Sequence, residues 1–349
     1  MPSTSIDTFF ACAILLAAAL MSTAFLTSTM QTSLNSTQDI NKESYLKGIA
    51  DRLVINPGTP TNWGISNTIP VDFGLASYPS TTNYEVDVDK ICRLNPTNNY
   101  SLSYFDLANS AKLSNIALGI TVSQIMSITI KQSANSTIGN NESLTFTILT
   151  SINSEPTAAT LQCYVVANNT LSWVSNVTSE TGLGFITIQI PIGSSLSSNL
   201  IVFARSSFDN RITSYAIYDI SNSTQETSPN NEILALSPLN YGLTLSTNES
   251  DLVVQGCYVF SYDYEDQSIT NIQNSSQFQL PKLIDNSPFV IVIYGVENGV
   301  YFQEWTAYPQ IPLKTGSNFV GSEQNVFSYV VTIKGVLYKL DISLGSVPS

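Results

Sequence analysis

Two stretches of similar pattern decide the expected fold: LTFTILTSINSEPTAATLQCYVV at residues 144–166 and GLTLSTNESDLVVQGCYVF at residues 242–260. They can be laid over one another with their cysteines aligned and Tyr-Val after each cysteine. Downstream, residues 199–219 and residues 287–309 share an apolar strand, a polar turn and an aromatic strand. We interpret these pairs as a tandem repeat of about 95 residues, the size of an immunoglobulin-like domain. The alternative is that any two β-sandwich sequences align this well through shared alternation.

Short alternating or β-branched runs fill the chain from Ile116 onward and are separated by Gly, Asn, Ser and Pro. Regularly spaced strands of this kind are typical of antiparallel sandwiches. Two tight hairpins are predicted, at Asn-Gly 298–299 and at Lys-Gly 334–335. We therefore expect a mainly β chain with two tandem immunoglobulin-like β-sandwich domains, at residues 116–230 and 231–349.

Residues 36–115 are predicted to form a small, partly helical neck. Apolar residues at spacings of three and four predict an amphipathic helix within residues 39–55, which ends before Asn-Pro-Gly 56–58 because proline disfavours helical backbone. Asp87 is expected to cap a short helix that continues to residue 94. Ser103 is expected to cap another that runs to about residue 113.

An uncharged apolar run, FFACAILLAAALMSTAFL, occupies residues 9–26. At about 1.5 Å of rise per residue this run is roughly 27 Å long as a helix, close to the thickness of a bilayer core. A cleaved signal peptide needs a basic start, and MPSTSID has no Lys or Arg. As a helix of a globular core the run is long, and it lacks the polar face that a surface-packed helix shows. We therefore expect residues 1–35 to hold an uncleaved membrane helix, with a signal peptide as the alternative.

Small residues on one flank of this predicted helix, Ala13, Ala17 and Ala24, would let another helix approach closely. The charges that flank the run bear on which side of the membrane the body lies. Lys42 and Lys47 follow the run, and positive charge usually marks the cytoplasmic side. Because a long domain can override that bias, we expect the body outside the cell.

Composition excludes several function classes. The chain has 13 Lys and Arg against 26 Asp and Glu, a formal net charge of −13. Nucleic-acid binding needs clustered Lys and Arg, so no nucleic-acid partner is expected. Only 11% of residues are charged, where about a quarter is usual, and this polar, uncharged surface fits an exported protein. Histidine is absent, which removes His-based catalytic triads and His metal ligands.

Four cysteines occur, at Cys12, Cys92, Cys163 and Cys257. Cys12 lies in the apolar run, so at most one intrachain disulfide can form among the other three, and the sequence does not say which. We expect Cys163 and Cys257 to fill small apolar core positions.

Several passages together carry a family resemblance: NPGTPTNWG at 56–64, DKICRLNP at 89–96, LSYFDL at 102–107 and IKGVLYKLDISL at 333–344, behind a hydrophobic opening helix. With that helix, they resemble archaeal membrane-anchored type IV pilin-like cell-surface proteins. The resemblance implies an exported, glycosylated protein that is anchored or polymerised through its N-terminal helix. Two features depart from the family: no basic residue and glycine precede the apolar run, and the β body is larger than a simple pilin head.

Carboxylates gather at Asp263, Glu265 and Asp266, and hard cations bind several oxygen ligands. The spacing is not that of a calcium loop, so we favour a solvated turn. Asp87 and Asp89 are explained by helix capping rather than by a catalytic pair. We expect no metal, no cofactor and no catalytic residue.

Aromatic residues on one predicted hairpin could form a platform for a sugar or a protein: Tyr294, Tyr301, Phe302, Trp305 and Tyr308. Phe302 and Trp305 differ in parity and should point to opposite faces, so at least one is expected in the core. Trp63 is expected to pin its own turn against the neck.

Candidate glycosylation sites of the form Asn-x-Ser/Thr are Asn35, Asn99, Asn135, Asn141, Asn168, Asn176, Asn222, Asn248 and Asn274. A chain this rich in Asn, Ser and Thr would show about seven by chance, so only an extracellular location would give them meaning. Most of them fall in predicted turns.

We expect a non-enzymatic cell-surface protein whose helix binds the membrane and associates with itself. Its β-sandwich body would serve a filament or adhesion to surface glycans or neighbouring cells. A membrane-anchored receptor for a ligand or sugar is the alternative, and an acid-active hydrolase ranks below both.

Overall fold

The computed structural model describes residues 20–28, 42–80, 82–113, 115–167, 170–193, 198–226, 234–237, 239, 241–245, 252–263, 267–269, 277–280, 287–317, 319 and 324–346. The chain divides into two compact units, Met1–Asp51 and Arg52–Ser349. Residues 20–28 and 42–55 are helical. Within the described ranges, no helix has both the length and the apolar character needed to cross a bilayer. The span predicted at residues 9–26 lies mostly in residues 1–19, outside the described residues.

The end of the first neck helix and the starts of the next two, predicted from local sequence, are confirmed. The first helix stops at residue 55, ahead of Asn56 and Pro57. Asp87 caps α2 (Val88–Cys92), its carboxylate accepting from the backbone N–H of the next turn. Ser103 caps α3 (Tyr104–Ser110) in the same way. Both helices are shorter than expected, and a 3-10 turn, η1 (Trp63–Ile65), precedes them.

The body is mainly β, as predicted. Its first half contains β2 (Met126–Ile138), β3 (Asn141–Ile152), β4 (Glu155–Pro156), β5 (Ala159–Ala167), β6 (Thr170–Val177), β7 (Leu183–Pro191), β8 (Ser198–Ser206), β9 (Thr213–Asp219) and β10 (Thr224–Glu226). Its second half contains β11 (Leu234–Ser237), β12 (Gly242–Leu245), β13 (Leu252–Ser261), β14 (Gln267–Ile269), β15 (Gln277–Gln279), β16 (Phe289–Glu297) and β17 (Val300–Tyr308). The remaining strands are β1 (Ile116–Gln124), β18 (Leu313–Gly316), β19 (Gln324–Ile333) and β20 (Val336–Ser346).

The same strand order occurs in both halves. In the first half, β2-β3-β7 form an outer sheet with β4, and β10-β9-β8-β5-β6 form a central sheet. In the second half, β11-β12-β15 form a small sheet, and β14-β13-β16-β17 form a distal sheet. Cys163 lies on β5 and Cys257 on β13, which hold equivalent places in this order. The strand order β6-β5-β8-β9 of the first half recurs in the second as β14-β13-β16-β17, while β4 and β10 have no counterpart among the described strands of the second half.

The middle strands of the central sheet, β5, β8 and β9, are buried on both faces. One face shares a core cluster with the outer sheet that includes Cys163 and Val165. The other face shares a second cluster with the distal sheet that includes Tyr164 and Val166. Every residue of β8 except Arg205 is buried. Strands covered on both faces are expected to be apolar throughout, which explains the unbroken LIVFA run of this strand.

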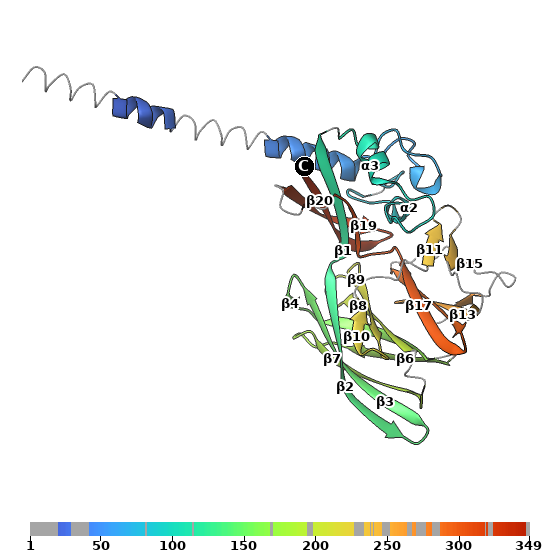
Figure 1. Cartoon of the computed structure of the whole chain (residues 1–349). Helices are drawn as coiled ribbons and strands as arrows, with labels where there is room; N and C mark the ends of the chain where they lie inside the picture. Colours follow the sequence, from blue (N-terminus) through green and yellow to red (C-terminus); the bar gives the residue numbers. More distant parts are fainter. Residues whose placement is uncertain are drawn as a thin grey trace, which may run out of the picture. The chain divides into compact units, whose positions relative to one another are not determined.

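A terminal sheet joins the start of the β body to its end, with order β18-β1-β20-β19. Figure 1 labels β1, β19 and β20 of this sheet. β1, which the sequence placed with the first sandwich, pairs along its whole length with β20. Alternate residues of β20 are buried, so one face of this sheet packs inward and the other meets solvent. The predicted hairpin turns at 298–299 and 334–335 are confirmed, with positive φ at all four residues.

Candidate functional site

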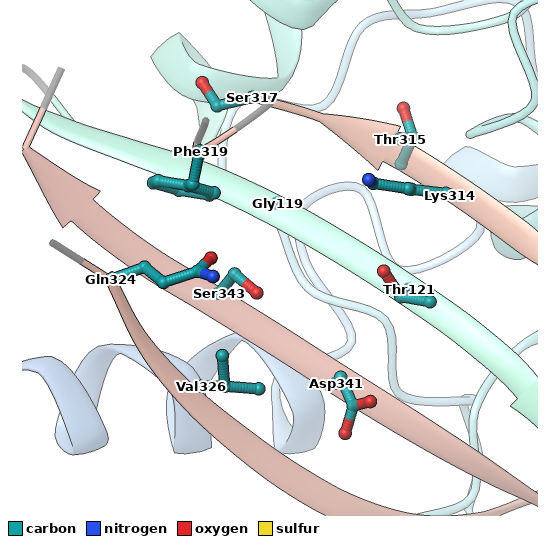
Figure 2. A pocket seen from close by; sticks show the side chains of 10 residues that line it. All are labelled: Gly119, Thr121, Lys314, Thr315, Ser317, Phe319, Gln324, Val326, Asp341 and Ser343. Atoms are coloured by element: carbon teal, nitrogen blue, oxygen red, sulfur yellow. The ribbon is translucent and has the colours of Figure 1, made fainter. Parts of the chain in front are cut away.

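The solvent-facing side of the terminal sheet holds a groove of about 330 Å³ (Figure 2). Gly119 of β1 forms its floor. A Cβ atom at this position would lie 3.1 Å from the ring of Phe319, so the absence of a side chain lets that ring approach the strand backbone closely. The groove is completed by Ser317, just after β18, and by side chains from the strands around Gly119: Thr121, Lys314, Thr315, Gln324, Val326, Asp341 and Ser343.

The polar groups of the groove are set by strand register. Thr121 lies between Lys314 on β18 and Asp341 on β20. The Asp341 carboxylate accepts hydrogen bonds from Ser328 Oγ at 2.6 Å and Lys339 Nζ at 2.8 Å. Lys314 forms no ion pair with any described residue. An aromatic face beside hydroxyl, carboxylate and ammonium groups suits a small polar ligand that also presents an apolar face, such as a saccharide.

Sequence reasoning missed this groove because its residues come from strands almost 200 positions apart. One signal was present: Gly119 interrupts the apolar run IALGITV. An isolated glycine within a strand often marks a site of close approach.

Two passages that carry the family resemblance meet in the neck, around Trp63. The Trp63 side chain is fully buried, and its indole N–H donates to the Gly74 carbonyl at 3.0 Å, so the expectation that it pins its turn is confirmed. Lys90 Nζ and the Arg93 guanidinium lie 5.8 Å and 5.6 Å from the centroid of its ring. Both cations are buried, and burial lowers the pKa of each.

The buried cations of the neck bind backbone carbonyls. Lys90 Nζ donates to the Pro57 and Ala76 carbonyls at 2.7 and 2.6 Å. The Arg93 guanidinium donates to the carbonyls of Trp63, Ser66, Thr68 and Tyr100. A buried carbonyl left unpaired is costly, so these contacts hold the irregular loop together. These contacts give the cluster a structural role.

The Asp87 and Asp89 carboxylates bind different groups. Asp87 is occupied as a helix cap, as predicted. The Asp89 carboxylate instead accepts from Tyr308 Oη at 2.9 Å and Tyr241 Oη at 3.2 Å. Burial, with the nearby Asp87 charge, raises the pKa of Asp89 to about 6. These bonds tie the neck to the end of β17.

A second polar contact at the same place involves Gln310. Its side-chain oxygen accepts from Asn95 Nδ2 at 2.9 Å and also from Asn98 Nδ2. All three side chains are buried. The DKICRLNP passage is therefore anchored to the segment that follows β17.

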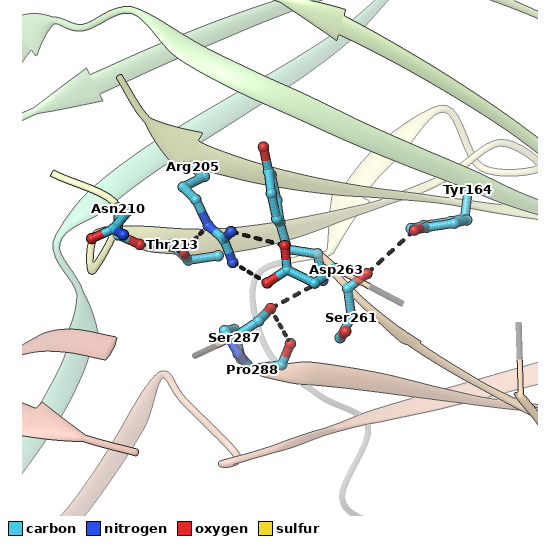
Figure 3. A network of polar contacts seen from close by, with 9 residues as sticks. Tyr164, Arg205, Asn210, Thr213, Ser261, Asp263, Ser287 and Pro288 are labelled. Atoms are coloured by element: carbon cyan, nitrogen blue, oxygen red, sulfur yellow. Dashed lines mark hydrogen bonds and ion pairs between the residues drawn. The ribbon is translucent and has the colours of Figure 1, made fainter. Parts of the chain in front are cut away.

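Asp263 of the acidic turn joins the two halves of the body (Figure 3). Its carboxylate accepts two hydrogen bonds from Arg205, at 2.9 and 2.6 Å, and the Arg205 guanidinium lies 3.8 Å from the Tyr262 ring centroid. Nearby, Tyr164 Oη donates to the Ser261 carbonyl at 3.3 Å. Glu265 and Asp266 lie outside the described residues, and no cluster of three or more potential metal-binding side chains occurs among the residues that are described.

The aromatic hairpin does not form one exposed platform. Trp305 and Tyr308 are buried, and Trp305 packs against Tyr215 in the core shared with the central sheet. Tyr294 stacks on Tyr258 with ring centroids 5.3 Å apart. Tyr301 remains 40% exposed. The parity argument, which placed at least one of these rings in the core, is confirmed by Trp305.

The cysteines behave as core residues. Cys92, Cys163 and Cys257 are buried free thiols, and burial raises the pKa of each. The core positions predicted for Cys163 and Cys257 are confirmed. No disulfide joins these three residues, which answers the pairing question that the sequence left open. Cys12 lies outside the described residues.

The candidate glycosylation sites fall in different environments. Asn99, Asn135, Asn176 and Asn222 are exposed, and Asn141 is half-buried. Contrary to the expectation of turns, Asn135, Asn141 and Asn176 lie in strands. The side-chain amide of Asn176 donates to the Phe185 carbonyl. The remaining candidates lie outside the described residues: Asn35, Asn168, Asn248 and Asn274.

Of the predicted helix-packing residues, Ala24 lies in the helix of residues 20–28 and is exposed. Ala13 and Ala17 lie outside the described residues. Their role in helix association stays a prediction.

Comparisons with known proteins give no family. No protein-family model matches the chain. No curated protein matches it either. Among solved structures, the chain is similar to HBP35 of Porphyromonas gingivalis at 14% identity, over 52% of this chain and 63% of that chain, with a TM-score of 0.21. The match spans less than two thirds of that protein, and a TM-score this low carries no conclusion about shared fold or function.

Proposed function

We propose that this protein is a non-enzymatic cell-surface structural protein of the archaeal pilin-like kind that its sequence resembles. Its N-terminal hydrophobic helix anchors or polymerises it, and its extracellular body serves filament formation or adhesion. In this proposal the body consists of two tandem immunoglobulin-like β-sandwich domains. The observation that supports it is the recurrence of one strand order. Each half has one sheet with three main strands, and the order in its other sheet is β6-β5-β8-β9 in the first half and β14-β13-β16-β17 in the second.

The junction between the two halves supports a load-bearing role. Domains in one chain usually move relative to each other unless their interface is large and apolar. Here the central and distal sheets share a buried cluster that includes Phe203, Phe260 and Val292. The Arg205–Asp263 contact adds a two-bond ion pair at its margin. A junction of this kind holds two domains as one stiff spacer.

The anchoring part of the proposal is tested with the full chain in cells. We expect the protein to sediment with membranes or filaments, and protease added to intact cells to digest the body. Leu16→Arg places a charge in the apolar run, where it costs about 3 kcal/mol at a bilayer centre. We expect this variant to leave the membrane fraction with an unchanged melting temperature.

The matched control is Leu16→Phe, which keeps the run apolar and should behave as the wild type. A wild-type protein that stays in the soluble interior of the cell and resists external protease would refute the anchoring proposal.

A second candidate is a membrane-anchored extracellular receptor for a ligand or sugar, favoured by the groove around Gly119 and Phe319. A glycan array with the purified full chain tests it. Phe319→Ala and Asp341→Asn should weaken binding of any glycan found by at least about tenfold, or about 1.4 kcal/mol. Lys131→Ala, on the distant β2, is the control and should bind as the wild type. Equal binding by the wild type and both groove variants would rule out the groove.

A further inference from the structure

One edge of the terminal sheet is open. β19 pairs with β20 on one side only. At its C-terminal end, the Thr332 N–H donates to the Tyr84 carbonyl at 3.0 Å, and the Thr332 carbonyl accepts from the Val86 N–H at 2.9 Å. Backbone groups alternate in direction along a strand, so every second residue before Thr332 presents its N–H and C=O to the same side.

The residues that present these outward groups are Gln324, Val326, Ser328 and Val330. None of them has a backbone hydrogen-bond partner on that side within the described part of the chain. Val326 and Val330 are also 50% and 58% exposed. The strand therefore offers four donor and acceptor pairs together with two exposed apolar side chains.

Two other edge strands of the body have side chains bonded to their open backbone groups. On β2, the Gln225 side chain donates to the Ile128 carbonyl at 2.7 Å and accepts from the Ile130 N–H at 2.8 Å. On β7, the Gln189 carbonyl accepts from the Ser172 hydroxyl of β6 at 3.3 Å. Proteins usually protect edges in such ways, or with charges and prolines.

β19 has neither form of protection. Its sequence, QNVFSYVVTI, contains no charged residue and no proline. A long, uncharged, partly apolar edge is a site at which another strand can be added.

We propose that β19 binds β19 of a second copy of this chain, antiparallel, about a two-fold axis at Phe327. In this register Val326 faces Ser328 of the other copy, and Gln324 faces Val330. Each of these pairs exchanges two main-chain bonds, roughly eight in all, which joins two four-stranded sheets into one. The pairing ends naturally at Thr332, whose outward groups are already bonded.

The absence of charge on β19 favours a second copy of this chain as the strand that binds there. Two molecules with a formal net charge of −13 each repel one another over most of their surfaces. A two-fold contact places each residue of the strand opposite another residue of the same strand. Because β19 holds no charge, no like charges are opposed along the contact. The nearest charges on β20, Lys339 and Asp341, are paired with each other.

This contact does not use the N-terminal helix, so it can be tested apart from the proposed anchoring. The full chain carrying Leu16→Arg, purified in detergent, provides a background without helix association. We expect a monomer–dimer equilibrium in sedimentation velocity. Ser328→Pro removes an outward N–H and leaves the bonds to β20 intact, and should weaken dimerisation by at least about tenfold.

The matched control is Ser328→Ala, which loses the same hydroxyl but keeps the N–H and should dimerise as the parent does. Val326→Lys changes the same edge without introducing a proline, so it tests the contact even if Ser328→Pro does not fold. It should also weaken the dimer. Circular dichroism melting verifies that each variant is folded.

Register is tested with a single cysteine. Phe327→Cys places a thiol opposite itself across the two-fold axis, at a non-hydrogen-bonded pair with Cα atoms about 4.5 Å apart, a separation that a disulfide bridges. We expect rapid covalent dimer formation under mild oxidation, and much less from Ser328→Cys. A parent that is monomeric at concentrations on the order of 100 µM overturns the proposal. So does a dimer that Ser328→Pro and Val326→Lys leave unchanged, even if a foreign peptide binds the edge.

Discussion

The central sheet and the terminal sheet come from the same kind of sequence but are used in opposite ways. The central sheet is covered by the outer sheet on one face and by the distal sheet on the other. The terminal sheet packs only one face inward, and its other face and the β19 edge remain open. Burial on both faces leaves the middle strands β5, β8 and β9 no free face with which to bind a partner. We therefore expect the central sheet to supply most of the stability of the body and the terminal sheet to supply its binding surfaces.

The largest effect should come from the central sheet. Phe203 is fully buried on β8 and packs against Tyr164 and Tyr215. Phe203→Ala leaves a cavity in the layer that both halves share and should lower the free energy of unfolding by about 3 to 5 kcal/mol. Chemical denaturation measures this. A loss below about 1 kcal/mol would mean that the central layer is not the stabilising one.

The next largest effect concerns the buried polar joint at Asp89. Its pKa of about 6 in the fold lies above its ordinary value of 3.8, so the unfolded chain ionises first as pH rises. Stability should therefore fall between about pH 4 and pH 6, by up to about 3 kcal/mol, and change no further from this group above that range.

Asp89→Asn removes that ionisation and should flatten this part of the pH profile. Differential scanning calorimetry of both proteins at pH 4 and pH 7 is the measurement. Identical pH dependence in the two would show that Asp89 is not shielded as the structure indicates.

A smaller effect is expected at the junction between the halves. The Arg205 side chain is 18% exposed and that of Asp263 is 40% exposed, so solvent screens their ion pair. Arg205→Ala should cost about 1 kcal/mol, and a double-mutant cycle with Asp263→Ala should recover a coupling of similar size. A coupling energy near zero would mean that the apolar cluster alone makes the junction stiff.

The smallest effect should come from the open surface of the terminal sheet. Val330 is 58% exposed, and Val330→Thr keeps a β-branched side chain. We expect the unfolding free energy to change by less than about 0.5 kcal/mol. If this substitution destabilises the monomer as strongly as a core change, the contrast between the two sheets fails.

Much of the local structure could be predicted from sequence because its causes are local. Asp87 and Ser103 cap helices because each side chain needs only the N–H groups of the next turn. The Asn-Gly at 298–299 forms a hairpin because both residues tolerate positive φ. The unbroken apolar run of β8 reflects burial on both faces.

What sequence did not predict depends on distant partners. Alternation shows which face of β1 is buried, but not that β20 is its neighbour. The groove needs Gly119, Lys314 and Asp341 to meet across three strands, and no short pattern encodes that. Lys90 and Arg93 are fully buried against the general tendency of charged residues, because loop carbonyls far along the chain bind them.

The position of β1 between β18 and β20 has a mechanical consequence. A pull that enters the β body at residue 116 acts along the axis of a strand that is bonded to an antiparallel neighbour on each side. To slide out, β1 must shear both ladders together, so many bonds share the force at once instead of opening in turn. The first strand of the body is thus placed to bear tension.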